Sequence, residues 1–478
     1  MPPAFVIDRL VLFGATGDLA GRFLFPALAE LQAEGELPTS FRIIGTGRDQ
    51  WSDDRFRQHV ATRLDEHAKD VAPDARDHLL RILCYWPLDV GASNAGEQVR
   101  ALLDTQARDS SGGALRPVAA YLALPPGLFV PAVRALDAAG LPRGSRIAIE
   151  KPFGVSYENA QELNRLLRTV AGDAGESAVF RVDHVLGMAT VHNLLGIRLA
   201  NRIIEPLWNT THIEQVDILW EETLALEGRA GYYDRAGALK DVMQSHMLQI
   251  LSLVAMEPPL TLNDRDLRDR KVEALRTVVT PTAGDMATRT RRARYTAGRL
   301  AGTGGAADRE VPDYSAEHGV DPDRHTETFA EVVLTLDSWR WAGAKFVLRA
   351  GKAMARRRKG VVVHFRPVPH LPFDAPLPPQ NTLKIGLDGP DDLSLHITGS
   401  RPGPPVELAP LVLEARLPAA ELRAYSHVLL DVLNGECTLS IRGDEAEEAW
   451  RIMTPVLDAW QNDLVPLEEY AAGSAGPD

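Results

Sequence analysis

A glycine-rich turn near the amino-terminal end of the sequence is the first segment that could do chemistry. Gly14-Ala-Thr-Gly17-Asp-Leu-Ala-Gly21 follows a short apolar run and precedes a segment with helical periodicity. A turn between a strand and a helix presents backbone N–H groups and the positive helix end to a pyrophosphate. The G-x-x-G-x-x-x-G spacing differs from the usual G-x-G-x-x-G, and a plain glycine turn would give the same letters. The candidate cofactor-binding residues of this turn are Gly14, Ala15, Thr16, Gly17, Asp18 and Leu19.

Two charged residues after the next apolar run bear on which dinucleotide would bind. Arg48 and Asp49 directly follow Thr46-Gly47. In dinucleotide-binding folds an acidic residue near this point binds the ribose 2′-hydroxyl of NAD, whereas an arginine accommodates the 2′-phosphate of NADP. Arg48 is therefore a candidate cofactor-binding residue that favours NADP, but Asp49 would repel the same phosphate. The local chemistry leaves the choice between NADP and NAD open.

The elements that must position these residues form two differently patterned halves. Up to about residue 183, short apolar runs alternate with segments of helical periodicity, which is typical of parallel strands joined by crossover helices. We expect strands at residues 5–13, 42–46, 118–124 and 146–150, and helices at residues 19–34, 51–67, 129–139 and 159–170.

Beyond residue 183 the pattern changes to strands separated by short turns, which predicts antiparallel pairing. We expect helices at residues 190–200, 237–256, 419–433 and 444–460, and strands at residues 212–222, 328–339, 345–349, 361–366, 382–387, 393–399 and 406–414. The predicted fold is an α/β Rossmann-like N-terminal domain plus an α+β C-terminal domain with a large, mainly antiparallel sheet. The expected boundaries are 1–183 and 184–470, with a disordered tail at 471–478.

The composition argues against several classes of function. The 52 basic and 65 acidic residues give a net charge of −13, which disfavours a nucleic-acid or anionic-membrane binder. No stretch approaches the ~18 apolar residues of a membrane span, and the start lacks the basic leader of a signal peptide. Cys84 and Cys437 form neither a metal-ligand spacing nor a disulfide framework, so we expect no metal and a cytoplasmic protein.

Six segments of the sequence are similar to one enzyme family. In chain order they are FGATGDLAGRFLFPAL (13–28), IEKPFG (149–154), RVDHVLGMATVHNLLGIRLAN (181–201), GYYDRAGALKDVMQSHMLQILSLVAMEPP (231–259), WRWAGAKFVLRAGKA (339–353) and DEAEEAWRI (444–452). Together they resemble the glucose-6-phosphate dehydrogenase family along nearly the whole chain. The resemblance implies oxidation of glucose 6-phosphate at C1 to 6-phosphoglucono-δ-lactone, with hydride transfer to NADP or NAD. It also implies a dinucleotide-binding domain, a substrate-binding and oligomerisation domain, and a homodimer or homotetramer.

The resemblance assigns the catalytic residues. The family's base is the histidine of a Q-N-H motif, which falls on His246 of Gln244-Ser245-His246. A histidine suits this task because its pKa lies near working pH, and such a base contributes ~10²–10⁴-fold to the rate. Asp183 matches the carboxylate that orients this imidazole and stabilises its charged form. Without the motif, His246 would be interpreted as a buried helical histidine.

The resemblance also assigns substrate-binding residues. Glu222 and Asp241 match carboxylates that bind sugar hydroxyls, a task suited to acceptor-only groups, although either could instead cap or pair locally. The remaining matches are Lys151, which touches both substrate and coenzyme, His184, which faces the phosphate, and Lys352 and Arg357, which are cations on the substrate side.

The sequence departs from the family where the sugar phosphate is held. The family segment usually reads D-H-Y-L-G-K. In this chain Val185 replaces the tyrosine and Met188 replaces the lysine. A lost charge-assisted hydrogen bond is worth ~1.5–3 kcal/mol, or roughly one to two decades of affinity. After the glycine turn only one cation, Arg22, remains where relatives carry several. We therefore expect dual or NAD-leaning coenzyme use.

Three functions remain open at this stage. The first is a glucose-6-phosphate dehydrogenase with a weakened phosphate site, acting on a small sugar phosphate and on neither nucleic acid nor membranes. The second is a related aldose dehydrogenase whose substrate lacks the 6-phosphate, which Val185 and Met188 favour and Lys352 and Arg357 disfavour. The third is a non-catalytic regulatory paralogue, against which the intact catalytic motifs argue.

Overall fold

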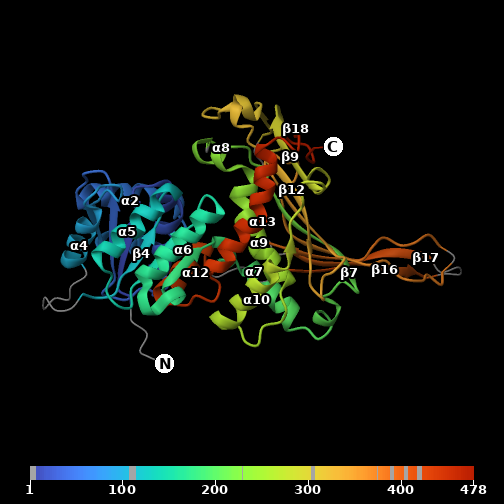
Figure 1. Cartoon of the computed structure of the whole chain (residues 1–478), viewed down its shortest axis with the longest axis horizontal. Coiled ribbons are helices and arrows are strands. Elements are labelled where there is room, and N and C mark those ends of the chain that lie inside the picture. The colour runs from blue at the N-terminus through green and yellow to red at the C-terminus, as the bar shows by residue number, and fades with distance from the viewer. Residues whose placement is uncertain are drawn as a thin grey trace. The chain divides into compact units, whose positions relative to one another are not determined.

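The computed structural model of the chain describes residues 7–106, 115–228, 230–302, 307–373, 375–387, 392–402, 407–416 and 422–477. The chain forms two compact units, and each has a sheet of its own (Figure 1). The first unit comprises Met1–Met188, Leu260–Arg268 and Ala420–Glu447. The second unit comprises Ala189–Pro259, Asp269–Ala419 and Glu448–Asp478.

The first unit is built on a six-stranded parallel sheet. Its strand order is β3-β2-β1-β4-β5-β6, so the order changes direction between β1 and β4. The strands are β1 (Arg9–Phe13), β2 (Arg42–Gly47), β3 (Leu83–Pro87), β4 (Ala119–Leu122), β5 (Arg146–Glu150) and β6 (Val179–Val182). Strands β4 and β5 are buried along their whole length, as strands of a parallel sheet are when helices cover both faces. The predicted Rossmann-like domain is confirmed.

The crossover segments of this sheet are helical. They are η1 (Ala20–Leu24), α1 (Phe25–Ala33), α2 (Asp53–His67), α3 (Pro73–Arg81), α4 (Ala95–Gln106), α5 (Phe129–Ala139) and α6 (Tyr157–Ala171). The expected helix at 19–34 is therefore a π-helical turn followed by an α-helix. Proline at the second position of α1 fits there because the first-turn N–H groups of a helix have no intrahelical acceptor.

The first unit also contains a helix from late in the chain, α12 (Ala424–Asn434). At its amino end, the carboxylate of Glu30 in α1 accepts a hydrogen bond from the backbone N–H of Arg423 at 3.0 Å. At its carboxyl end, the guanidinium of Arg146 in β5 donates to the carbonyl of Val432 at 2.8 Å. These groups satisfy terminal N–H and C=O groups that have no partner within the helix. Side chains of α1 and β5 thus fix α12 in place.

The second unit is built on a ten-stranded sheet. Its order is β17-β16-β15-β14-β7-β13-β12-β9-β18, and β8 pairs with β12. The strands are β7 (Ile213–Glu221), β8 (Val278–Val279), β9 (Thr290–Thr296), β12 (Phe329–Leu336), β13 (Lys345–Gly351), β14 (Arg358–Phe365), β15 (Thr382–Gly386), β16 (Asp392–Arg401), β17 (Glu407–Arg416) and β18 (Leu467–Ala471). Among the described pairs of this sheet, β13·β7 and β18·β9 are parallel and the others antiparallel. The mainly antiparallel sheet is confirmed, and β16 and β17 form its long hairpin (Figure 1).

The helical segments of the second unit include α7 (Ala189–Leu199), α8 (Ala230–Ala238), η6 (Leu239–Met247) and α9 (Leu248–Ala255). Two longer helices, α10 (Asp264–Arg276) and α13 (Gly443–Gln461), contribute residues to both units. Within the described ranges, none of the helices combines the length and the apolar character needed to cross a membrane.

Residues near the end of the chain form hydrogen bonds with the segment that follows β13. The N–H of Gly473 donates to the carbonyl of Ala353, and the N–H of Ala355 donates to the carbonyl of Ser474, both at 2.7 Å. The segment AAGSAGPD has few side chains that could signal packing. Residues 471–477 are held by backbone hydrogen bonds and by the Arg291 side chain, which donates to the carbonyl of Pro477, and local composition does not indicate these contacts.

Candidate active site

The predicted site residues of the first unit lie at the carboxyl ends of its parallel strands. The glycine turn follows β1, Arg48 follows β2, Lys151 follows β5, and Asp183 and His184 follow β6. Carboxyl ends of parallel strands meet at one edge of the sheet, where open α/β folds bind ligands beside the change of strand order. Here that change lies next to β1. The structure therefore brings the predicted coenzyme residues and two predicted substrate residues to one edge.

Gly14 gives the glycine turn its shape. Its φ is +79°, and a Cβ at this position would lie 2.3 Å from the carbonyl oxygen of Ala123. The N–H groups of Gly14 and Ala15 both donate to the carbonyl of Thr46, at 3.0 and 2.9 Å, which ties the turn to β2. Only glycine fits this left-handed, crowded position, because the carbonyl of Ala123 occupies the space that a side chain would need.

The charges near this turn are mostly at the surface. Asp18 and Arg22 form an ion pair at 2.7 Å, with both side chains about half exposed. Arg48 and Asp49 are exposed, and the backbone carbonyl of Asp49 accepts a hydrogen bond from the Tyr85 hydroxyl at 3.0 Å. The one cation after the turn is therefore already neutralised by a neighbouring carboxylate.

A buried carboxylate that the sequence analysis did not single out precedes Lys151. Glu150 ends β5 and is 6% exposed. The hydroxyl of Tyr121 donates to it at 2.6 Å. Burial raises the pKa of Glu150 to about 7, although the Tyr121 hydrogen bond and the charge of Lys151 act in the opposite direction. An acidic residue that ends an apolar strand is the signal that could have marked it.

Asp183 and His184 begin the short helical turn η4 (His184–Gly187). The carboxylate of Asp183 is 3% exposed and caps this turn by accepting the N–H of Val185 at 3.1 Å. The His184 ring stacks on Tyr425, with centroids 5.4 Å apart and an interplanar angle of 13°. Val185, where the family usually has tyrosine, is completely buried, whereas Met188 is partly exposed.

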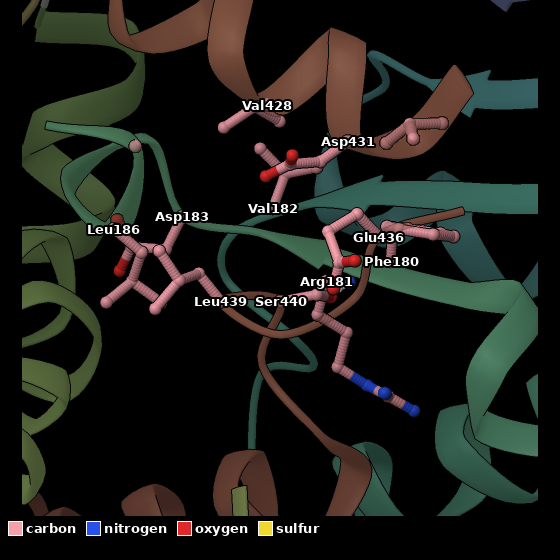
Figure 2. A pocket seen from close by; sticks show the side chains of 12 residues that line it. Phe180, Arg181, Val182, Asp183, Leu186, Val428, Asp431, Glu436, Leu439 and Ser440 are labelled. Atoms are coloured by element: carbon pink, nitrogen blue, oxygen red, sulfur yellow. Dashed lines mark hydrogen bonds between the residues drawn. The ribbon is translucent and has the colours of Figure 1, made fainter. Parts of the chain in front are cut away.

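A pocket lies beside Asp183 in the first unit, and β6, η4 and α12 contribute to its lining (Figure 2). Among its lining side chains are the carboxylates of Asp183, Asp431 and Glu436 and the guanidinium of Arg181. Arg181 is bonded to the carboxylate of Glu176 at 2.7 Å. Burial raises the pKa of Asp431 to about 7, and the charge of Glu436 adds to the shift. Because carboxylates outnumber cations, this pocket does not suit a phosphate.

In the second unit, three neighbouring strands bring predicted substrate residues together. Glu222 follows β7, Lys352 follows β13, and Arg357 precedes β14. Glu221, the last residue of β7, pairs with Gly351 of the parallel β13 and with Arg358 of the antiparallel β14. The register therefore places all three predicted residues at one end of the central strands.

Glu222 lies between two lysines. Its carboxylate oxygens contact Lys352 Nζ at 2.7 Å and Lys359 Nζ at 3.0 Å. Burial alone would raise the pKa of Glu222, but the two ammonium charges and their hydrogen bonds lower it to about 2. Glu222 is thus an ionised acceptor throughout the physiological pH range. Both partners are distant in sequence, and the two ion pairs fix the Glu222 carboxylate at the end of β7.

Lys359 is a second functional candidate that the sequence analysis did not single out, because it ends a run of four basic residues, 356–359. In β14 it shares a face with Val361 and Val363, which are both fully buried. Its side chain is 11% exposed, and its ammonium lies 4.3 Å from the centroid of the Trp220 ring. Alternation with the two valines is the signal that could have shown that Lys359 points inward.

His246 and Asp241 lie on η6, a π-helical segment that contacts β7 and β13. His246 is 3% exposed and stacks on Trp220, with centroids 5.3 Å apart. Asp241 is partly exposed and accepts a hydrogen bond from the Tyr232 hydroxyl at 3.3 Å. Wide helical turns of this kind occur frequently at functional sites. Trp220 therefore links the predicted base to the Glu222–Lys359 pair.

Arg357 differs from the other substrate candidates because its side chain is exposed. Its neighbour Arg358 donates to the buried carboxylate of Glu221 at 2.7 Å. In the second unit the structure thus groups Glu222, Lys352, Asp241 and His246 on elements that touch, with Arg357 at the surface end of β14. Asp183, Lys151 and His184 belong to the first unit.

Comparisons with known proteins agree with this architecture. A family model described as "Glucose-6-phosphate dehydrogenase, NAD binding domain" matches residues 11–193, and one described as "Glucose-6-phosphate dehydrogenase, C-terminal domain" matches residues 195–478. The chain is 37% identical to the glucose-6-phosphate 1-dehydrogenase of Treponema pallidum, with 98% of this chain and 92% of the relative covered. It is also 37% identical to that of Rhizobium meliloti, with 98% and 94% covered.

Two solved structures are similar along the whole chain. The crystal structure of glucose-6-phosphate 1-dehydrogenase from Mycobacterium avium has a TM-score of 0.84 at 31% identity, covering 99% of this chain and 95% of that one. A glucose-6-phosphate dehydrogenase in complex with its substrate glucose-6-phosphate has a TM-score of 0.86 at 28% identity, covering 100% and 97%.

Proposed function

We propose a role for each site residue from one premise: the chain belongs to the glucose-6-phosphate dehydrogenase family. It oxidises glucose 6-phosphate at C1 to 6-phosphoglucono-δ-lactone and transfers a hydride to a nicotinamide coenzyme. The observation that carries this function is the match of both family domains across nearly the whole chain. The test follows the absorbance of the reduced coenzyme with glucose 6-phosphate and either NADP or NAD. We expect reduction, and no reduction with either coenzyme would contradict the function.

His246 is the base in this proposal. As the hydride leaves C1, the C1 hydroxyl must lose its proton, and a neutral imidazole can accept it. His246 is buried and held against Trp220, so few orientations are open to its ring. Asp183 is assigned to the charged form of the base because it matches the carboxylate of the family's Asp-His pair. An ionised carboxylate in that role stabilises the imidazolium without itself taking the proton.

The other polar side chains of the candidate site bind the sugar. Glu222, with its pKa lowered to about 2, accepts hydrogen bonds from sugar hydroxyls, and Asp241 does the same. Lys352, Arg357 and His184 supply positive charge or N–H donors to the substrate and its phosphate. Lys151 serves both substrate and coenzyme.

The glycine turn is the proposed site of the coenzyme pyrophosphate. What supports this is the place of the turn, between the end of β1 and the helical segment η1, where dinucleotide-binding folds hold a pyrophosphate. Residues Gly14 to Leu19 would hold the pyrophosphate, and Arg48 would face the ribose 2′ position. When bound, the nicotinamide accepts the hydride from C1.

For coenzyme choice, we propose that NAD is used at least as readily as NADP. Arg22 is already paired with Asp18, and the carboxylate of Asp49 adjoins Arg48. Both features weaken the attraction of this edge for the additional 2′-phosphate of NADP. The ratio of kcat/KM for the two coenzymes tests this directly, and a ratio strongly in favour of NADP would contradict it.

A second candidate, oxidation of an aldose without the 6-phosphate, is favoured by one observation. Val185 is fully buried where the family has a phosphate-binding tyrosine, and Met188 replaces the lysine. Kinetics with glucose and glucose 6-phosphate separate the candidates. A higher kcat/KM for glucose would select the second, whereas no activity with either sugar would select the regulatory paralogue.

The location, the oligomeric state and the metal dependence of the enzyme are inferred from the sequence and its family. We infer a cytoplasmic homodimer or homotetramer, which light scattering coupled to size-exclusion chromatography and fractionation of the source cells would test. The lack of metal-ligand spacing in the sequence leads us to expect a metal-free reaction. Dialysis against EDTA should accordingly leave kcat unchanged.

A further inference from the structure

Three aromatic rings form a continuous stack in the first unit. Tyr425 stacks on Phe23 with centroids 5.3 Å apart at 27°, and on His184 with centroids 5.4 Å apart at 13°. Phe23 lies in η1, directly after the glycine turn, and Tyr425 lies in the first turn of α12. Stacked rings at these distances attract one another beyond their burial. The stack therefore connects the coenzyme turn to the predicted phosphate-facing histidine.

The central ring of this stack, Tyr425, is buried close to a buried carboxylate. Tyr425 is 8% exposed, and burial together with the nearby charge of Glu150 raises the pKa of its hydroxyl. Glu150 accepts the hydroxyl of Tyr121 at 2.6 Å. A buried tyrosine usually needs a partner for its hydroxyl, and a buried carboxylate needs donors. Tyr121 thus supplies Glu150 with a donor, and burial restricts the motion of the Tyr425 ring.

The backbone around Tyr425 is equally constrained. Glu30 accepts the N–H of Arg423 at 3.0 Å and the hydroxyl of Ser426, so both sides of Tyr425 are tied to α1. On the η4 side, a Cβ on Gly187 would lie 2.6 Å from the carbonyl oxygen of Ala424. This close approach of η4 to α12 brings His184 within stacking distance of Tyr425.

We propose that Tyr425 is a positioning residue that holds the His184 imidazole in the orientation required to bind the sugar 6-phosphate. The inference rests on the proposed function of His184. In this chain Val185 is buried and carries no hydroxyl, so the phosphate depends more heavily on a well-oriented His184. The ring of Tyr425 acts through His184, on which it stacks, and not on the phosphate.

The first test compares Tyr425→Leu with Tyr425→Phe in the full-length enzyme. Tyr425→Leu removes the stacking ring, and we expect KM for glucose 6-phosphate to rise about three- to tenfold, the range that corresponds to one lost aromatic pair. The Ki of inorganic phosphate as a competitive inhibitor should rise by the same factor, whereas kcat and the KM of the coenzyme should stay within about twofold. Tyr425→Phe retains the stack and should restore the parent values.

A matched control is Phe56→Leu, which removes a buried aromatic ring elsewhere in the first unit. Phe56 packs against Tyr85 with centroids 5.1 Å apart. Its loss should lower the free energy of unfolding without changing the KM of glucose 6-phosphate. If Phe56→Leu and Tyr425→Leu raise this KM equally, the effect is general destabilisation and the proposal is wrong.

A double-mutant cycle shows whether Tyr425 acts through His184. His184→Ala alone should raise the KM of glucose 6-phosphate, and Tyr425→Leu added to it should have no further effect. Additive effects would show that Tyr425 acts independently and would overturn the proposal. An unchanged KM in His184→Ala would also overturn it while leaving the reaction itself intact. Failure of the proposed function has a different signature, because the unmodified enzyme would then not oxidise glucose 6-phosphate.

Discussion

Replacement of Lys359 by methionine removes one of the two ammonium groups that hold Glu222 while retaining an unbranched side chain. The pKa of Glu222 is about 2 in the folded protein, whereas a glutamate without interactions has a pKa of 4.5. Burial alone would raise this pKa, so the neighbouring charges account for the lowering. A difference of this size corresponds to about 3 kcal/mol of folding stability. Two lysines supply the favourable charge, at 2.7 and 3.0 Å. Lys359 should account for roughly half, so its loss should cost about 1–2 kcal/mol near pH 7.

The pH dependence of this loss separates charge from packing. Glu222 has a lowered folded-state pKa, so its contribution is present above about pH 4.5 and is lost as the pH falls towards 2. The stability difference between parent and Lys359→Met should therefore shrink in that interval. Urea unfolding at pH 7 and pH 3 measures it, with Lys359→Arg as the charge-preserving control. An equal loss at both pH values would refute the electrostatic account and assign the effect to contact with Trp220.

Three further perturbations test other parts of the site. Arg48→Ala should raise the KM for NADP strongly and leave the KM for NAD nearly unchanged, because only NADP carries the 2′-phosphate. Asp49→Ala should lower the KM for NADP. Equal effects on both coenzymes would show that neither residue faces the 2′ position. Met188→Lys should lower KM for glucose 6-phosphate by up to about tenfold but not KM for glucose, whereas a tyrosine at the fully buried Val185 would overpack its surroundings. Asp431→Asn should stabilise the protein more at pH 8 than at pH 4 by urea unfolding. The pKa of Asp431 is raised from 3.8 to about 7, so its burial penalises folding once the carboxyl ionises, by at most about 4 kcal/mol.

The sequence patterns that predicted the fold correctly were those that reflect burial of one or both faces of a strand. The apolar run of β5 and the alternation of β12 and β13 each marked a strand in the expected place. Strand β9 was missed because three of its seven residues are arginines. Arg292 is 4% exposed there because its guanidinium donates to the carbonyl of Val465 at 2.9 Å, a long-range partner that no local pattern shows.

Candidate site residues could be predicted from the sequence where they belong to a motif. They could not be predicted where only their burial in the folded chain marks them. Gly14 could be recognised from its place after a strand, and His246 from the family motif. Three residues were missed for different reasons. Glu150 is an isolated buried acid, and Lys359 follows a run of arginines. Tyr425 lies on a helix about 240 residues after His184 in the sequence. Their partners become visible only when distant segments are packed together.

The central claim, that this chain oxidises the sugar with His246 as the base, is tested most directly by the kcat of His246→Asn. Asparagine retains a similar polar shape but cannot accept the C1 hydroxyl proton in the same way. We predict that kcat with glucose 6-phosphate falls by at least ~10²-fold while KM stays near the parent value. A His246→Asn enzyme that folds and turns over glucose 6-phosphate at nearly the parent kcat would contradict this account.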